Sequence, residues 1–424
     1  MFGLTPTTPP DCSLFTLKVV DNHCYRLTYN PSHPRQSRVP ENRMASKVRF
    51  VFLLGLSSLL VTPLYAGQIL ASGHWTMTAH LANARHQHMM VLLNDGRVLV
   101  AGGMQGASPL SSSEIYDPQA GRWSPGGNLA VGRAATSGVV LSDGKVLLAG
   151  GCLGACNEPA GVTELYDPQT DTWSQTGSLN VPRYFHTSTL LGNGKVLVTG
   201  GCDSMNCATE TASVEIYDPG TGTWSSAAPL MEARYRHTAT LLANGQVLVT
   251  GGDSGHGVLA STEIYDTEAD DWMPVGDLEA RRYLHTATLL RDGTVMVVGG
   301  RGGIFGAMLC STEVFDLSSG QWTYARSIGK MVQDHTATLL PDGIVLVAGG
   351  TGVVSINNKV VYHSKTKSRL YSPRNRTWLP TKRLNGARTE HTAVRLKNGD
   401  VLAAGGMDSK SNDLDTAELY SEGK

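Results

Sequence analysis

The chain has 424 residues, of which 41% are hydrophobic, 17% are charged and 48 are glycine. This apolar content excludes a disordered chain and a coiled coil. The formal net charge is −1, so the basic field of a nucleic-acid-binding protein is absent and no nucleic-acid partner is expected.

The N-terminal region predicts export. Residues 50–61 form an apolar run of 12 that follows two basic residues and precedes a small-residue cleavage pattern at 64–66. This run is shorter than the roughly 20 residues that span a bilayer, and it suits the core of a signal peptide. We interpret 44–66 as a signal peptide and 1–43 as an unstructured leader or a mis-assigned start. An uncleaved membrane anchor is the alternative.

The mature chain, 67–424, is predicted to be one domain without a stable membrane span. Export through a signal peptide would place it outside the cytoplasm, as a secreted, periplasmic or cell-surface protein.

Seven copies of one sequence unit follow. Gly-Gly pairs recur with their first glycines 48, 50, 51, 48, 50 and 56 residues apart, and all seven tryptophans recur at similar intervals. The pairs start at Gly102, Gly150, Gly200, Gly251, Gly299, Gly349 and Gly405, and the tryptophans are Trp75, Trp123, Trp173, Trp224, Trp272, Trp322 and Trp378.

Each unit predicts four β-strands. In the fourth unit, HTATLL and QVLVT are runs rich in β-branched residues, and Asn244-Gly245 between them predicts a two-residue hairpin turn with positive φ at both positions. The second run is apolar throughout, which indicates burial on both faces. Glu-x-Tyr-Asp marks a third strand and the tryptophan a fourth. The glycine pair permits positive φ or close approach of another backbone.

Repeats of about 50 residues with four strands each are typical of a β-propeller. The Gly-Gly, Tyr and Trp landmarks, at 102–103, 116 and 123 in the first unit, resemble those of the kelch-repeat family, and the resemblance extends from Trp75 to Tyr420. The predicted fold is therefore all-β, a seven-bladed propeller of four-stranded antiparallel blades.

The phase of the repeats predicts how the propeller closes. Trp75 is a fourth-strand residue with no strands before it, and the chain leaves after the third strand at 418–420. We expect the strand around Trp75 to complete the last blade, 388–420, because closure removes exposed sheet edges.

In six of the seven units, an arginine near the start and a glutamate on the third strand predict a buried ion pair within the blade. The sixth unit has Val332 and Arg369 at these two positions, and losing both partners together favours pairing inside one blade. The predicted structural pairs are Arg85 with Glu114, Arg133 with Glu164, Arg183 with Glu215, Arg234 with Glu263, Arg282 with Glu313 and Arg388 with Glu418.

Six histidines recur three residues after the arginine position. They could suggest a metal ring, but a residue needed in nearly every blade is better explained as a partner of buried backbone groups, so no metal site is expected. The six are His88, His186, His237, His285, His335 and His391.

Two neighbouring loops contain paired cysteines directly after Gly-Gly. For an exported protein we predict one disulfide in each loop, Cys152 with Cys156 and Cys202 with Cys207. The alternative is a zinc site with four thiolates that bridges the two blades.

The sixth blade has the longest loop and a concentration of basic residues, with eight basic and no acidic residues in 351–383. Such a field could attract an acidic partner, although the acidic residues of the seventh blade could neutralise it. The candidate binding residues are Lys359, His363, Lys365, Lys367 and Arg369.

The loops that follow the Gly-Gly pairs share one face, which the kelch resemblance implies is the ligand face. We expect a monomeric binding scaffold rather than an enzyme, and we expect it to recognise a protein or glycan without a cofactor. The alternative is a kelch-type enzyme, either a copper radical oxidase, whose relatives use Tyr, His and a Tyr–Cys crosslink, or a sugar-modifying enzyme. The one Tyr-His step is Tyr362-His363.

Overall fold

The computed structural model describes residues 15–21, 24–29, 73–302, 307–330, 332–356 and 359–423. The chain divides into two units, 1–70 and 71–424. In the first unit, β1 (Phe15–Asp21) pairs with β2 (Cys24–Tyr29) as an antiparallel hairpin. Part of the segment that was predicted as an unstructured leader therefore has regular backbone structure. The predicted signal peptide, 44–66, lies outside the described residues.

The second unit consists of short antiparallel strands in four-stranded sheets. The sheets are here called blades and are numbered along the chain, and the strands of each are given from first to fourth. Blade one contains β4 (Met89–Leu92), β5 (Val98–Ala101), β8 (Ser113–Asp117) and β9 (Arg122–Pro125), and blade two contains β10 (Ser137–Val140), β11 (Val146–Ala149), β14 (Thr163–Asp167) and β15 (Thr172–Gln175). Blade three contains β16 (Thr187–Leu190), β17 (Val196–Thr199), β18 (Val214–Asp218) and β19 (Thr223–Ala227), and blade four contains β20 (Thr238–Leu241), β21 (Val247–Thr250), β22 (Thr262–Asp266) and β23 (Asp271–Pro274).

Blades five to seven repeat the same order. Blade five contains β25 (Thr286–Leu289), β26 (Val295–Val298), β29 (Thr312–Asp316) and β30 (Gln321–Ala325). Blade six contains β31 (Thr336–Leu339), β32 (Val345–Ala348), β35 (Ser368–Ser372) and β36 (Thr377–Pro380). Blade seven contains β37 (Thr392–Arg395), β38 (Val401–Ala404), β39 (Ala417–Ser421) and β3 (His74–Met77).

Short elements occupy the loops between the second and third strands. They are β6 (Met104–Gln105), β7 (Ser108–Pro109), β12 (Cys152–Leu153), β13 (Glu158–Pro159), the 3-10 helix η2 (Met205–Cys207), β27 (Arg301–Gly302), β28 (Ala307–Met308), β33 (Thr351–Ile356) and β34 (Lys359–Ser364). A further short strand, β24 (Arg282–Tyr283), precedes the first strand of blade five and pairs with β27. We call the end of the ring that carries these loops the loop face.

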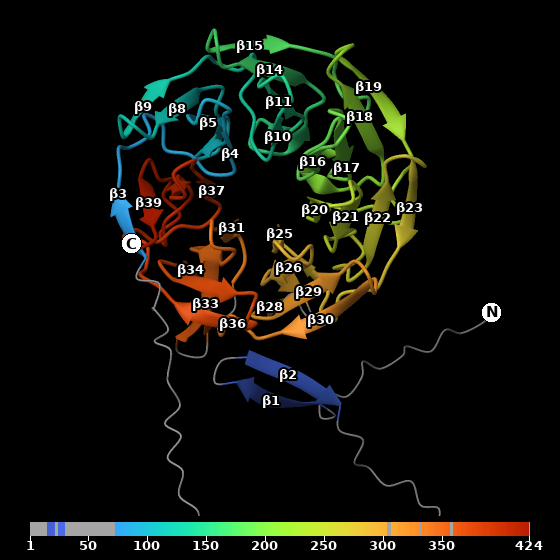
Figure 1. Cartoon of the computed structure of the whole chain (residues 1–424), viewed down its shortest axis with the longest axis vertical. Coiled ribbons are helices and arrows are strands. Elements are labelled where there is room, and N and C mark those ends of the chain that lie inside the picture. Colours follow the sequence, from blue (N-terminus) through green and yellow to red (C-terminus); the bar gives the residue numbers. More distant parts are fainter. Residues whose placement is uncertain are drawn as a thin grey trace, which may run out of the picture. The chain divides into compact units, whose positions relative to one another are not determined.

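The blades form a ring around a common centre (Figure 1). The first strand of each blade contacts the first strand of the next, and β37 of blade seven contacts β4 of blade one. β3 pairs with β39 in antiparallel register, with Trp75 opposite Tyr420. The prediction of an all-β propeller of four-stranded blades is confirmed, and the described part of the chain contains seven such sheets.

The hairpin between the first two strands differs from its prediction. In blade four the Gly245 N–H donates to the Leu242 carbonyl at 3.0 Å, and the Leu242 N–H donates to the Gln246 carbonyl at 2.8 Å. Gly245 has a φ of 87°, whereas Asn244 does not have positive φ. The connection is therefore a three-residue loop with a bulge, in which glycine alone supplies the left-handed residue, and the predicted two-residue turn is wrong.

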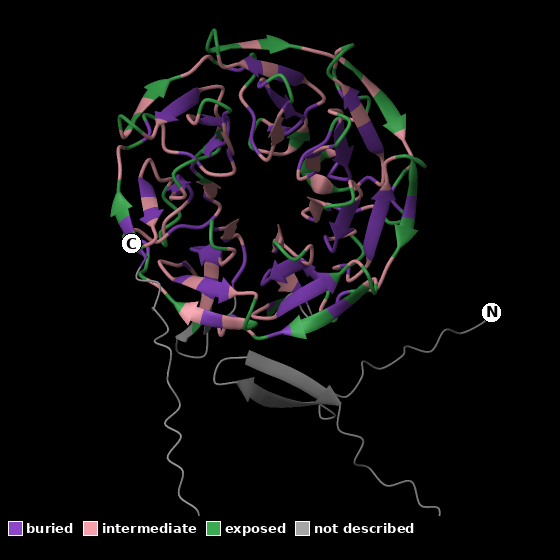
Figure 2. Cartoon of the chain, in the orientation of Figure 1, coloured by how far each residue is buried: buried purple, intermediate pink, exposed green. Residues whose placement is uncertain are grey.

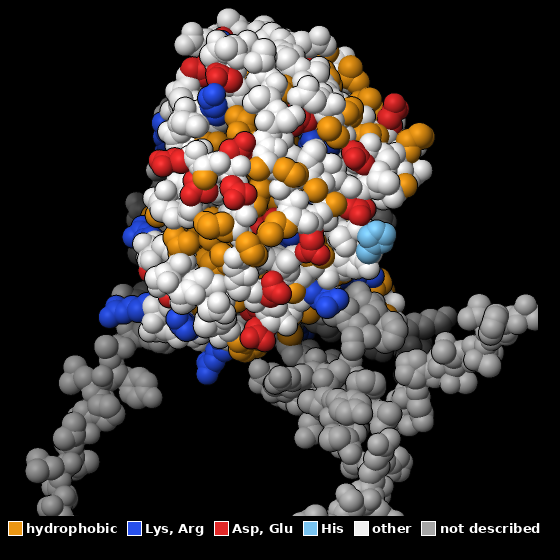
Figure 3. All heavy atoms as spheres, turned by 90° about the vertical axis from the view of Figure 1, so that its right-hand side faces the viewer, with side chains coloured by type: hydrophobic (Ala, Val, Ile, Leu, Met, Phe, Trp, Pro, Cys, Tyr) orange, Lys and Arg blue, Asp and Glu red, His pale blue; other side chains and the backbone are white. Residues whose placement is uncertain are grey.

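Burial follows the position of a strand in its blade. The second strands are buried at every residue, whereas most residues of the fourth strands, at the rim, are exposed (Figure 2). Viewed from the side that carries β19 and β23, acidic, basic and apolar side chains are interspersed (Figure 3). In the described part of the chain, no helix is long and apolar enough to cross a membrane.

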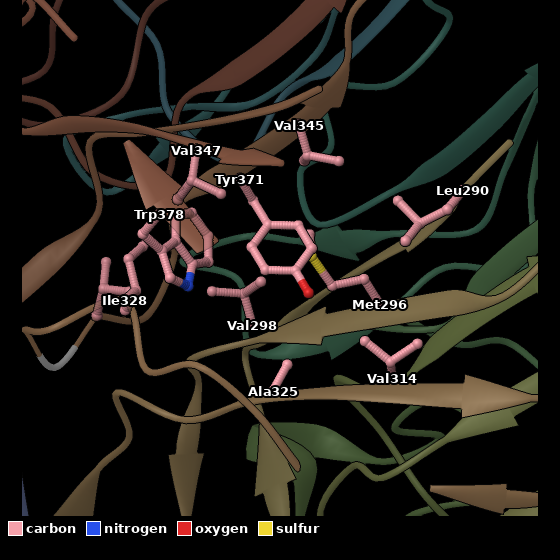
Figure 4. Packing of buried hydrophobic residues seen from close by; sticks show 11 residues of the cluster. Leu290, Met296, Val298, Val314, Ala325, Ile328, Val345, Val347, Tyr371 and Trp378 are labelled. Carbon is pink, nitrogen blue, oxygen red and sulfur yellow. The ribbon is translucent and has the colours of Figure 1, made fainter. Parts of the chain in front are cut away.

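The core lies between successive blades. Each tryptophan packs against the aromatic residue of its own third strand, with ring centres 4.9–5.2 Å apart. Between blades five and six, Met296 and Val298 of one sheet meet Val345, Val347 and Tyr371 of the other (Figure 4). Interdigitated side chains of this kind supply most of the stabilisation of a sheet-on-sheet contact.

The glycine pairs join neighbouring blades through the backbone. The Gly103 N–H donates to the Arg133 carbonyl of the next blade at 2.9 Å, and the Gly406 N–H donates to the Arg85 carbonyl at 2.8 Å, which completes the circle. A Cβ atom at Gly102 would lie 2.4 Å from the Arg133 carbonyl oxygen, and Gly102 also has a φ of 65°. Gly102 therefore meets both conditions that predict glycine, positive φ and the close approach of another backbone.

Candidate functional site

A ring of main-chain hydrogen bonds surrounds the centre of the loop face. One residue in each blade, two positions after the arginine position, has φ between 50° and 55°, and its N–H donates to the carbonyl of the equivalent residue in the preceding blade at 3.0–3.4 Å. The members are Gln87, Ala135, Phe185, Arg236, Leu284, Asp334 and Glu390. Sequence analysis missed this ring, because the residues at this constant spacing from the arginine position share no chemical type.

The ring encloses a pocket of about 320 Å³, which we call the central pocket. The Arg236 guanidinium carbon lies 4.1 Å from the centre of the Phe185 ring, at a cation–π distance. Burial, with a contribution from nearby Glu390, raises the pKa of Asp334 to about 6. The pocket thus brings together an aromatic ring, a guanidinium group and a carboxyl group, a combination found in ligand sites.

Five of the six recurring histidines line the same pocket, all except His391, and most of the six form contacts between blades. In five blades, the histidine Nε2 lies within hydrogen-bond distance of a threonine hydroxyl on the preceding blade. For example, His335 Nε2 lies 2.9 Å from Thr286 Oγ1. These partners are side chains rather than the backbone groups that we expected. Burial lowers the pKa of His335 to about 3, so its ring is neutral at pH 7.

The predicted Arg–Glu partners are brought together in six blades. Arg85 lies 2.9 Å from Glu114, Arg133 lies 2.6 Å from Glu164, and Arg183 and Arg388 each lie 2.9 Å from their glutamates, Glu215 and Glu418. Arg234 with Glu263 and Arg282 with Glu313 also form close ion pairs. The arginine side chains are fully buried.

Each pair also organises the loop face. In blade one, Arg85 Nη1 donates to the carbonyls of Gly102 and Ser112, at 2.7 and 3.0 Å. Glu114 accepts the N–H groups of Ala82 and Asn83 at 2.7 and 3.1 Å. Because the pair fixes both the loop that enters the blade and the loop that follows Gly-Gly, it acts as a support for the loops that differ between blades.

Both cysteine pairs form disulfides inside their own loops. Cys152 is bonded to Cys156 and Cys202 to Cys207. The two loops also meet, because the Asn206 N–H donates to the Asn157 carbonyl at 2.8 Å. The four thiolates of the zinc alternative are therefore consumed by disulfide bonds.

The candidate binding residues of blade six lie along one extended hairpin and its base. β33 and β34 pair over six positions, whereas the matching hairpins of blades one and two have two positions. The Lys359 side chain lies outside the described residues. His363 pairs with Gly352, and burial, with a contribution from Lys365, lowers the His363 pKa. Lys365, Lys367 and Arg369 lie at the base of the hairpin around a small cavity.

The acidic residues of blade seven have partners away from these basic side chains. Asp413 contacts His86 of blade one at 2.6 Å, and Asp415 lies 3.4 Å from His80. Glu418 pairs with Arg388, while Asp408 accepts N–H groups within its own turn. Asp400 accepts a hydrogen bond from Asn398 at 2.8 Å. The expected neutralisation between the two blades is therefore absent from the described contacts.

Comparisons with known proteins identify the family to which the chain belongs. The family model of the KLHDC2/KLHL20/DRC7 Kelch-repeats domain matches residues 137–350, and that of the Kelch motif matches residues 91–130. The chain belongs to the kelch-repeat family. No curated protein matches it. Among solved structures, this kelch-repeat chain is similar to a fungal alcohol oxidase of the AA5 family in complex with copper, with a TM-score of 0.67 and 18% identity over 83% of this chain and 76% of that one.

The likeness to the copper enzyme concerns the fold, because the identity is low. In the described part of the kelch-repeat chain, no three His, Cys, Asp or Glu side chains are grouped so that they could hold a metal ion. Tyr362 of the Tyr-His step is 52% exposed and its ring lies 5.9 Å from the Arg301 guanidinium carbon. These residues do not fit the copper site of an oxidase, and we derive no copper chemistry from them.

Proposed function

We propose that the chain is an exported kelch-repeat scaffold that binds a protein partner carrying acidic and apolar groups on its loop face. The observation that carries this proposal is the extended hairpin of blade six, β33–β34. It combines exposed apolar side chains with basic side chains at its base, on a fold whose repeated charged residues are otherwise occupied in the scaffold.

The apolar part of the hairpin is exposed to solvent. Val354, Val360 and Val361 are 41%, 65% and 39% exposed, and Tyr362 is 52% exposed. Large apolar side chains gathered on one exposed element mark interaction sites more often than isolated ones do. Three neighbouring valines complement apolar protein side chains, whereas a sugar would favour aromatic faces. We therefore favour a protein over a glycan.

The hairpin continues towards the centre of the loop face. Arg301, from the loop of blade five, lies over the Tyr362 ring, and its charge also acts on Asp334 in the central pocket. The hairpin and the central pocket can therefore contribute to one continuous binding surface. Basic residues beside this surface would speed association with an acidic partner and make its affinity dependent on salt.

Export is supported by the signal-peptide pattern at 44–66 and by the two loop disulfides, since disulfides persist in oxidising compartments.

A peptide library displayed on phage tests the proposal. We expect selection on the purified chain to enrich peptides that contain both acidic and apolar residues, and the double variant Val360→Ser/Tyr362→Ser to bind them at least tenfold more weakly. The matched control is Tyr324→Ser, which removes a tyrosine that is 59% exposed on the rim strand β30.

Two results would overturn this assignment. One is selection of peptides whose dissociation constants are equal for the parent and the hairpin variant. The other is a glycan array that yields a ligand while the library yields none, which would assign the loop face to carbohydrate.

A further inference from the structure

Blade six differs from the other blades at the position of the buried glutamate. Arg369 is paired with Val347 in the sheet register, just as Glu418 is paired with Ala403 in blade seven. Its side chain also reaches the equivalent loop. A Cβ atom at Gly329 would lie 3.8 Å from Arg369 Nη2, and a Cβ atom at Gly386 would lie 3.7 Å from Glu418 Oε1. A cation therefore stands where the other blades have a carboxylate.

A small cavity lies in blade six next to Val332 and Arg369, which stand at the positions of the pair. Its apolar floor is formed by Ile328, Val332 and Val347, and the first and last of these lie beside Trp378 in the packing between blades five and six (Figure 4). Its basic walls are Lys330, Lys365, Lys367 and Arg369. The volume is about 20 Å³, so the cavity can admit only a small group.

Among the described residues that line this cavity, all the charged ones are basic. Burial, together with the charge of Lys367 and Lys330, lowers the pKa of Lys365 to about 8. Burial also lowers the pKa of Lys367 to about 8, with contributions from Arg369, Lys330 and Arg383. Positive charges in partly desolvated surroundings are stabilised when an anion enters. The third strand of blade six does not supply one.

We propose that this cavity is a binding site for a carboxylate group, which enters from outside the blade and supplies the negative charge that glutamate supplies in the six other blades. The size favours a carboxylate over the bulkier phosphate and sulfate groups. Lys367 and Arg369 would donate hydrogen bonds to it, and Arg is suited to a bidentate contact. The group could come from a small free carboxylate or from an acidic side chain of a bound protein.

Both possible sources present a carboxylate group, so carboxylate binding is tested first, with acetate and the intact chain. The unfolding temperature is measured against acetate concentration at ionic strength held constant with sodium fluoride, with acetamide as the neutral match, and binding is read directly from the line width of ¹³C-acetate in NMR. We expect a saturable rise in unfolding temperature with acetate and none with acetamide.

Matched variants locate the effect. Lys367→Gln/Arg369→Gln should weaken acetate binding at least tenfold. Arg374→Gln/Arg376→Gln, which removes two exposed charges from the turn between β35 and β36, should leave it unchanged. Val332→Arg/Arg369→Glu rebuilds the pair of the other blades and should abolish the response to acetate. An equal response from the parent and Lys367→Gln/Arg369→Gln, or no saturable response from the parent, would overturn the site.

A peptide arm separates the two sources of the carboxylate. The capped peptides acetyl-Gly-Glu-Gly-amide and acetyl-Gly-Gln-Gly-amide are compared with acetate in the same assay. Tighter binding of the Glu peptide than of acetate, by tenfold or more, assigns the site to a side chain of a partner. Equal or weaker binding assigns it to a free carboxylate. Since acetate alone tests the cavity, its failure is distinguishable from failure of the proposed partner on the hairpin.

Discussion

Each buried arginine is held by more than its glutamate. Arg234 also donates to the carbonyl of Gly251 at 2.8 Å and to the hydroxyl of Ser261 at 3.0 Å, and Glu263 accepts the N–H of Met231 at 2.7 Å. Removing one partner leaves the other charge buried, without an opposite charge and without access to water. Removing both also leaves backbone groups without partners, so the loss of stability should be less than additive but not zero.

A double-mutant cycle measures this coupling. Glu263→Ala is expected to lower the free energy of unfolding by about 3–5 kcal/mol because it leaves Arg234 buried and unpaired. Adding Arg234→Ala should cost clearly less than the two single losses combined, as measured by urea unfolding. Additive losses would show that the two side chains stabilise the blade independently.

The buried histidines predict loss of stability in acid. The folded-state pKa of His335 is about 3, below the ordinary value of 6.5. Its contribution is therefore fully present above pH 6.5 and is lost as the pH falls towards 3, because the unfolded chain takes up the proton first. Replacing it with Gln should flatten the decline of unfolding free energy across that interval.

The control for this experiment is His256→Gln, which removes an exposed histidine from the loop of blade four. A pH profile that is as steep in His335→Gln as in the parent would contradict the assignment of acid sensitivity to this ring.

At the scale of elements, the long hairpin of blade six is separable from the core. β33 and β34 pair with each other, and their outer valines are exposed, so few buried contacts depend on the tip. Replacing residues 353–362 by Asn-Gly would keep the pair Gly352–His363 and reproduce the short hairpins of the other blades.

We expect this replacement to shift the unfolding temperature by less than about 2 °C, as for surface changes away from the core. Calorimetry measures the shift, and the same protein should no longer bind peptides selected on the parent. A large loss of stability would mean that the hairpin belongs to the fold rather than to recognition.

The regular spacing of the repeat made the strands predictable, and the unit that departs from the repeat was more informative than the units that follow it. Spacing located the strands, and the joint loss of arginine and glutamate at Val332 and Arg369 indicated which charges meet. The central ring was not found, because residues as different as Ala135, Phe185 and Arg236 occupy it. Their shared property is a backbone angle, which residue type does not reveal.

In the candidate site, the disulfides could be predicted from the sequence, whereas the arrangement of the basic residues could not. The position of the cysteines within each loop, together with the predicted export, favoured this pairing over a zinc site. The basic residues of blade six were recognised as a group, but the strands separate them. Arg374 and Arg376 lie in the turn after β35, away from the base of the hairpin. Only the three-dimensional arrangement reveals the cavity between Lys367 and Arg369.

For the whole molecule, closure by β3 predicts tolerance of circular permutation. His74 lies opposite Ser421 in the antiparallel pair, so a linker of Asn-Gly from 421 to 74 would form an ordinary hairpin. New termini would be placed in the exposed turn at Asn244 and Gly245, where backbone breaks are best tolerated.

The permuted chain should show the circular dichroism of unpermuted 74–421 and unfold cooperatively within a few degrees of it. Absence of a cooperative transition would argue that β3 does more than complete the last blade.

The ring of hydrogen bonds at the centre of the loop face has a consequence for diversification. Its joints are made by peptide groups, so the seven positions impose a backbone angle without prescribing a chemical type, as their occupants from Ala135 to Glu390 show. New ligand preferences could therefore be acquired there one substitution at a time while the circular architecture stays closed. Laboratory libraries randomised at these seven codons would exploit the same independence.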